Sequence, residues 1–154
     1  SREGFIDILQ ICNEPTADFA WSAAACPEEG WLWFSLKDPD ILNSTTLWME
    51  NRGRHGQPWN GRNSCIGVED VCTHLADGLS VAAEENGLTR EGVRTCHILK
   101  ADSPFEVKYV HAAARIPAGF DRAASIEKTP GGVLIKSFSG ATVECRVDTS
   151  FVKA

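Results

Sequence analysis

The chain has 154 residues, a hydrophobic content of 43%, a charged content of 23% and a formal net charge of −6. These values are typical of one soluble globular domain spanning residues 1–154, which is long enough to bury a core without disulfide staples. The net negative charge argues against non-specific binding to nucleic acid, which requires a basic surface. No apolar run approaches the roughly 20 residues that span a bilayer. We therefore expect neither a nucleic-acid partner nor a membrane partner.

Most segments along the chain are predicted to be β-strands. Apolar or alternating runs, bounded by Gly, Pro and Asp, predict strands at residues 31–36, 44–50, 64–69, 93–99, 105–111, 133–138 and 141–147. Ser139-Gly140 is a candidate hairpin turn between the last two. The aromatic residues Trp31, Trp33 and Trp48 are expected in the core, because aromatic side chains dominate core burial.

One helix is predicted over residues 70–83. Val71, Leu75, Leu79 and Ala82 recur at helical spacing, and Asn86-Gly87 either ends the helix or forms a turn. The fold class is therefore mainly β, with an antiparallel β-sandwich and one short helix. A large sheet with one covering helix is the alternative.

The six cysteines are spaced irregularly and form no C-x-x-C pair. Disulfide frameworks are typical of smaller secreted chains, and Cys65, Cys72 and His74 do not have a standard zinc spacing. Free thiols among apolar neighbours behave as small hydrophobic groups. The sequence predicts reduced, structural cysteines in a cytoplasmic protein without a metal. A nucleophilic cysteine paired with His74 or His97 stays open as an alternative.

Residues 51–63 form a polar, glycine-punctuated loop that packing alone does not require. Guanidinium groups supply planar forks of donors, asparagine amides donate and accept, and tryptophan supplies a flat apolar face. This mixture suits a hydroxyl-rich ligand such as a sugar, or an anionic one such as a sugar acid. The candidate ligand-binding residues of the loop are Arg52, Arg54, Trp59, Asn60 and Arg62.

A short apolar run, residues 65–68, then ends in Glu69 and Asp70. A carboxylate at the end of a strand, directly after a polar loop, is typical of a general base, whose pKa burial tunes toward the working range. The alternative is that both acids open the following helix, where the helix dipole favours negative charge.

Together these segments resemble a known family. The run from Trp48 through Arg62, residues 65–70, Ala76-Asp77-Gly78-Leu79, and Asn86-Gly87-Leu88-Thr89 with Gly92 are similar to the C-terminal half of the aldose 1-epimerases, the galactose mutarotase-like group. The resemblance covers roughly residues 30–125. It implies half of a β-supersandwich with a sugar site on its concave face, and on it Glu69 falls on the catalytic glutamate.

The resemblance implies opening and closing of a sugar hemiacetal ring, without a cofactor. Glu69 would take the proton from the anomeric hydroxyl. His55 is the expected acid for the ring oxygen, because the family's catalytic histidines lie in an N-terminal half that has no counterpart here. Arginines of the loop would hold the sugar hydroxyls, and Asp70 is counted with the substrate-binding residues.

Three functional classes stay open. The first is an enzyme of the epimerase kind, and the second is a non-catalytic carbohydrate-binding or assembly module. A homodimer would then cover the sheet edge that a halved fold leaves exposed. The third and weakest is a metal-dependent enzyme using Cys72, His74, Glu69 and Asp70.

Overall fold

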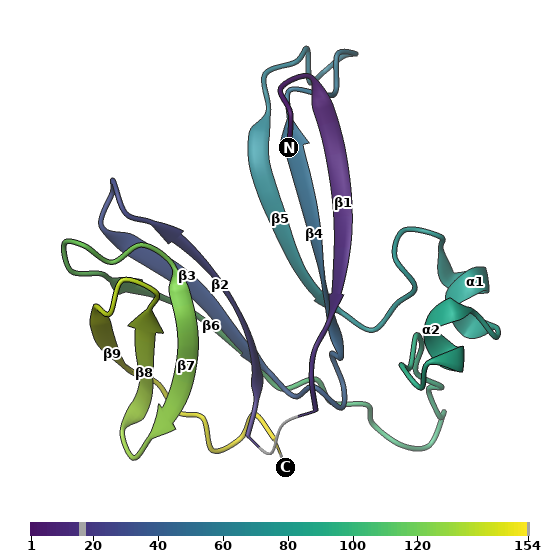
Figure 1. Ribbon diagram of the computed structural model, residues 1–154. Helices are drawn as coiled ribbons and strands as arrows, with labels where there is room; N and C mark the ends of the chain where they lie inside the picture. The colour runs from purple at the N-terminus through teal and green to yellow at the C-terminus, as the bar shows by residue number, and fades with distance from the viewer. Residues whose placement is uncertain (16–17, 154) are drawn as a thin grey trace. The chain divides into compact units, whose positions relative to one another are not determined.

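The computed structural model describes residues 1–15 and 18–153, which group into two compact units (Figure 1). Unit 1 comprises Ser1–Glu14 and Asp40–Phe105, and unit 2 comprises Pro15–Pro39 and Glu106–Ala154. The described residues form nine strands in three antiparallel sheets and two short helices, so the predicted mainly-β fold is confirmed. That the whole chain is a single domain stays a prediction.

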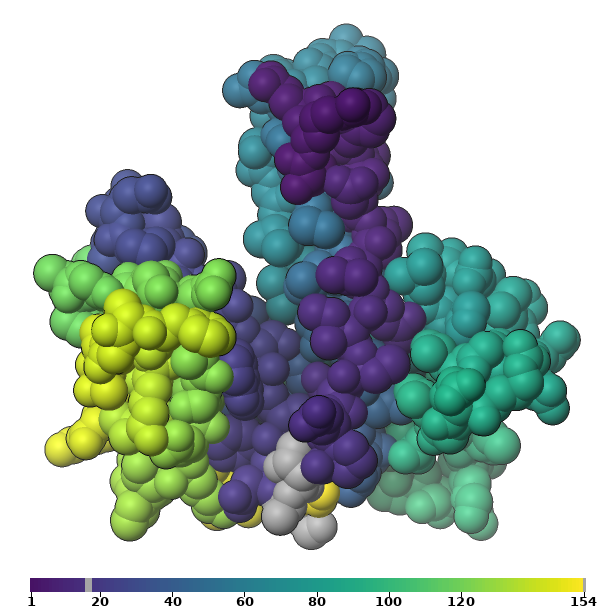
Figure 2. All heavy atoms as spheres, viewed as in Figure 1, coloured from purple at the N-terminus to yellow at the C-terminus, as the bar shows by residue number. Residues whose placement is uncertain are grey.

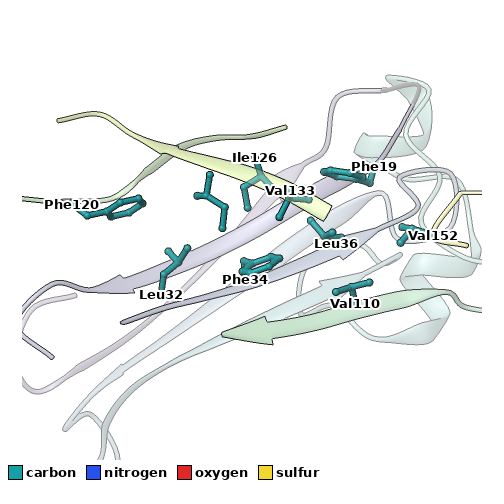
Figure 3. Packing of buried hydrophobic residues seen from close by; sticks show 10 residues of the cluster. Phe19, Leu32, Phe34, Leu36, Val110, Phe120, Ile126, Val133 and Val152 are labelled. Atoms are coloured by element: carbon teal, nitrogen blue, oxygen red, sulfur yellow. The ribbon is translucent and has the colours of Figure 1, made fainter. Parts of the chain in front are cut away.

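Unit 2 is a small antiparallel β-sandwich. One sheet has the order β2-β3-β6, with β2 at Ala20–Cys26, β3 at Trp31–Lys37 and β6 at Tyr109–Arg115. The other has the order β7-β8-β9, with β7 at Ala123–Thr129, β8 at Gly132–Ser137 and β9 at Thr142–Arg146. Leu32, Phe34 and Leu36 of β3 pack in one core with Ile126 of β7 and Val133 of β8 (Figure 3).

Unit 1 is built on one three-stranded sheet of order β1-β4-β5, with β1 at Phe5–Cys12, β4 at Ser44–Asn51 and β5 at Ser64–Val71. The central strand β4 pairs along its whole length with both neighbours. Side chains alternate between the two faces of a sheet. Ile8, Trp48 and Gly67 therefore share one face, which we call the pocket face, and Leu9 and Leu47 lie on the opposite face.

Strand β1 leaves an unusual amount of apolar surface uncovered. Its large apolar side chains are between 37% and 48% exposed. Figure 2 shows this N-terminal strand, in purple, at the surface of unit 1. The sequence prediction missed β1, because apolar residues on both faces of a strand do not give a simple alternating pattern. Strands β2 and β7 were also missed.

The predicted helix over residues 70–83 is wrong over most of its length. Asp70 and Val71 are the last residues of β5, and helix α1 occupies only Leu79–Ala83. Leu75 and Gly78 have φ angles of +40° and +88°, which a right-handed helix cannot contain. Neither helix in the described part of the chain is long enough to cross a membrane.

Asn86 begins a helix instead of ending one. Its side-chain oxygen accepts the backbone N–H groups of Leu88 and Thr89, at 3.0 and 3.1 Å, and caps helix α2 at Gly87–Arg90. The predicted strand at residues 93–99 is also wrong, since no strand is assigned there. The side chains of this segment hold it instead: Thr95 donates to the carbonyl of Ala82 at 2.7 Å.

Candidate functional site

A pocket of about 420 Å³ opens on the pocket face of the unit 1 sheet. Ile8 is paired with Trp48, and Thr46 is paired with Glu69, so these four side chains emerge on the same face from three strands. Residues from just beyond the strand ends complete the wall. The full lining is Ile8, Thr46, Trp48, Arg54, Glu69, Val71, Thr73, Leu75 and Ala76.

Glu69 presents an exposed carboxylate to this pocket. Within the described residues, no hydrogen bond or ion pair engages its oxygens. Gly67 provides the space beside it: a Cβ there would lie 3.3 Å from Glu69 Oε1 and 3.6 Å from Trp48 Cβ. The acid is therefore available to a ligand, and a larger residue at position 67 would crowd its carboxylate.

Arg54 is held over the indole of Trp48 by several contacts. Its guanidinium carbon lies 4.3 Å from the centre of the Trp48 ring and 5.1 Å from that of Trp59, both within cation–π range. Its Nε lies 3.6 Å from Glu50 Oε2, and its backbone N–H donates to Glu50 Oε1 at 3.0 Å. Because the Glu50 side chain is only 3% exposed, its charge requires this partner.

Trp48 is the main site residue that sequence reasoning misses. The sequence assigned it to the core, whereas the half-buried indole lines the pocket between Ile8 and Arg54. Its position two residues after Thr46 and two before Glu50, on the strand that feeds the polar loop, was the available clue. Thr46, Ile8 and Thr73 were likewise not singled out.

The other loop residues lie outside the pocket lining. Arg52 pairs with Glu3 at 2.8 Å, and both side chains are exposed. Arg62 donates to the backbone carbonyl of Pro58 in its own loop at 3.1 Å. Trp59 meets the pocket only through its contact with Arg54, and Asn60 is exposed with a positive φ of 51°.

The structure does not bring Asp70 and His55 to the same pocket as Glu69. Asp70 follows Glu69 on β5 and so emerges on the opposite face, where its Oδ1 accepts the hydroxyl of Thr45 at 2.7 Å. His55 is exposed in the loop beside Gly61, and it is absent from the lining. The described lining of this pocket therefore contains no imidazole.

The ligand set of the metal-dependent alternative is not assembled. Glu69 and Asp70 lie on opposite faces of β5, and His74 Nδ1 is bound to Asp77 Oδ2 at 2.8 Å. Among the described residues, no group of three or more His, Cys, Asp or Glu side chains could hold a metal ion.

Comparisons of the chain with protein-family models, with curated proteins and with solved structures give no match. The chemistry available in the pocket is that of its own side chains. A free carboxylate accepts protons and hydrogen bonds, a guanidinium donates several hydrogen bonds, and an indole offers a flat apolar face. This combination can hold a polyhydroxylated ring and remove a proton from one hydroxyl.

Proposed function

We propose that this protein binds an aldose in the unit 1 pocket and interconverts its anomers, with Glu69 as the general base. The observation that carries the proposal is that Glu69, Arg54 and Trp48 line one pocket. The resemblance of residues 30–125 to the aldose 1-epimerases supports the same role for Glu69.

A neutral sugar suits the pocket better than a sugar acid. The charge of Arg54 is already balanced by the buried carboxylate of Glu50, and Glu69 adds an unpaired negative charge. Arg52 and Arg62, the other arginines of the loop, make their contacts outside the pocket. An anionic ligand would thus meet net repulsion, whereas a neutral ring would receive hydrogen bonds from Arg54 and donate hydrogen bonds to Glu69.

The proposed reaction needs no redox step. Glu69 takes the proton of the anomeric hydroxyl, the electron pair of that O–H bond forms the aldehyde C=O, and the bond from the anomeric carbon to the ring oxygen breaks. The ring oxygen takes a proton from an acid. Water is the proposed acid, because His55 lies beside Gly61 outside the pocket and the described lining contains no imidazole. Rotation of the aldehyde and the reverse steps then close the ring on the other face, which regenerates both groups.

The test is polarimetry of α/β interconversion on a panel of aldoses, corrected for the uncatalysed rate. Glu69→Gln keeps the shape of the side chain but removes the base, so its rate should fall by about 10²–10⁴-fold. Asp70→Asn is the matched control, because it changes the adjacent acid on the opposite face. Equal losses in both variants, or none in Glu69→Gln, would contradict the role of Glu69.

A second candidate function, assembly without turnover, is favoured by the exposed apolar side chains of β1. A homodimer that pairs β1 edges would satisfy the backbone hydrogen-bonding groups of the edge and place the apolar side chains of two β1 strands next to each other. Sedimentation over a range of concentrations tests this directly. A single monomeric species at all concentrations would contradict it, whereas a dimer without mutarotation in the wild type would favour it over the enzyme.

A further inference from the structure

A second pocket in unit 1, of about 380 Å³, carries two thiols. Cys72 directly follows β5, and Cys96 lies in the extended segment that follows α2. All six cysteines of the chain are free thiols in this structure. Cys72 and Cys96 line the same pocket, although a long stretch of sequence that contains both helices separates them.

The segment around Cys96 is fixed against unit 1 by side-chain hydrogen bonds on both sides of the thiol. Thr95, which is 1% exposed, donates to the carbonyl of Ala82 at 2.7 Å and accepts from Asn86 Nδ2 at 2.9 Å. On the other side, His97 Nε2 lies 2.8 Å from the carbonyl oxygen of Ile41. The hydrogen bonds of Thr95 and His97 therefore hold Cys96 in its position in the pocket.

Cys72, the residue directly after β5, contacts the same segment. Its Sγ donates to the carbonyl oxygen of Arg94 at 3.5 Å, two residues before Cys96. Burial raises the pKa of the Cys72 thiol, the Arg94 charge opposes this, and the neighbouring Cys96 raises the pKa further. The electrostatic effect of one thiol on the other agrees with their place on one pocket wall.

We propose that Cys72 and Cys96 are a dithiol that closes to a reversible disulfide when the protein meets hydrogen peroxide. One thiol loses its proton, and its thiolate attacks the peroxide; the O–O bond breaks, a sulfenic acid forms, and the departing hydroxide takes up the proton and leaves as water. The second thiol attacks the sulfenic sulfur, the S–S bond forms, and a second water leaves. The two thiols lose two electrons and two protons, and the peroxide is reduced to two water molecules.

The disulfide would tie the segment after α2 to the end of β5. Thr73, Leu75 and Ala76 line both this pocket and the pocket of Glu69, so the tie would also fix a shared wall. Closing a loop that contains both helices restricts the unfolded chain and should raise the thermal midpoint. This modification site does not depend on the proposed sugar chemistry.

The test treats the intact wild-type protein with hydrogen peroxide, blocks remaining thiols with N-ethylmaleimide, and identifies linked peptides by mass spectrometry without reduction. We expect a Cys72–Cys96 linked peptide, the loss of two thiols, and a thermal midpoint that rises by several degrees and returns after dithiothreitol. Because the raised pKa leaves little thiolate on Cys72 near neutral pH, linkage should be faster at pH 9 than at pH 7.

Cys12→Ser is the matched control, since it removes an exposed thiol outside this pocket and should leave the linkage unchanged. Cys96→Ser should abolish both the linked peptide and the rise in thermal midpoint. Oxidation of the wild type without a Cys72–Cys96 peptide would overturn the proposal, and so would equal yields of links to other cysteines. Neither result bears on Glu69.

Discussion

Strands β3 and β1 are both rich in large apolar residues, but they lie in opposite environments. In β3 of unit 2, Leu32, Phe34 and Leu36 are each 0% exposed, because a second sheet packs over them. In β1 of unit 1, Ile8 and Leu9 are 45% and 48% exposed. Strands of similar apolar composition therefore serve two purposes. The apolar residues of β3 form a buried core, whereas those of β1 stay exposed on a sheet whose face carries a pocket.

The two units must therefore be stabilised differently. Unit 2 has an apolar cluster between its sheets, and apolar burial is the dominant favourable term in folding. Unit 1 depends more on its strand pairing and on buried polar side chains such as Asn86, Thr95 and Glu50. Substitutions in the two units should separate these contributions.

The largest effect is expected from Phe34→Ala. Removing a fully buried phenylalanine should lower the free energy of unfolding by about 3–5 kcal/mol. Leu9→Ala, at a half-exposed position in β1, should cost about 1 kcal/mol or less. Denaturant unfolding of both variants gives the comparison. A loss at Leu9 as large as that at Phe34 would show that β1 is covered in solution, and the contrast between the strands would fail.

A smaller effect is expected from Asn86→Ala in unit 1. Asn86 caps α2 and also donates to the carbonyls of Val81 and Glu84 and to Thr95 Oγ1. Losing the cap and these buried hydrogen bonds should cost about 2 kcal/mol. Hydrogen exchange should quicken in residues 79–95 and stay unchanged in β3. Faster exchange in both places would mean that the two units do not respond independently.

The smallest effect concerns an exposed charge in unit 2. The hydrogen bond from Lys136, together with that from Ser125, holds the pKa of Glu127 below its ordinary value of 4.5. A lowered folded-state pKa stabilises the fold above that ordinary value and loses the contribution as pH falls through the folded-state pKa. The thermal midpoints of wild type and Glu127→Gln should therefore differ at pH 7, and this difference should disappear as the pH falls through the lowered folded-state pKa of Glu127. A constant gap across this range would refute the assignment.

The sequence predicted correctly those strands that are recognisable from their own residue types. The aromatic run of β3 and the β-branched start of β4 consist of residues that are enriched in strands, and both strands form where predicted. The helix over residues 70–83 failed, because strand pairing with β4 extends β5 to Val71 and overrides the helical spacing. The alternation at residues 93–99 reflects side-chain anchoring, as at Thr95, and not pairing with another strand.

The candidate site was predictable only in part, for a geometric reason. Glu69 and Arg54 are recognisable by residue type, and the structure brings them to one pocket. Trp48 was assigned to the core, because its sequence neighbours do not reveal that its side chain lines a pocket. Asp70 was grouped with Glu69, but the structure places their side chains on opposite faces of the sheet, because adjacent residues of a strand point to opposite faces.

The most direct test of the sugar site is a titration of the isotopically labelled protein with an aldose, followed through its methyl NMR resonances. Ile8 and Val71 line the pocket beside Glu69, whereas Ile66 and Val68 alternate onto the opposite face of the same sheet. The account predicts saturable shifts of the Ile8 and Val71 methyl groups, with those of Ile66 and Val68 unmoved. Shifts confined to Ile66 and Val68, or no shifts with any aldose, would contradict it.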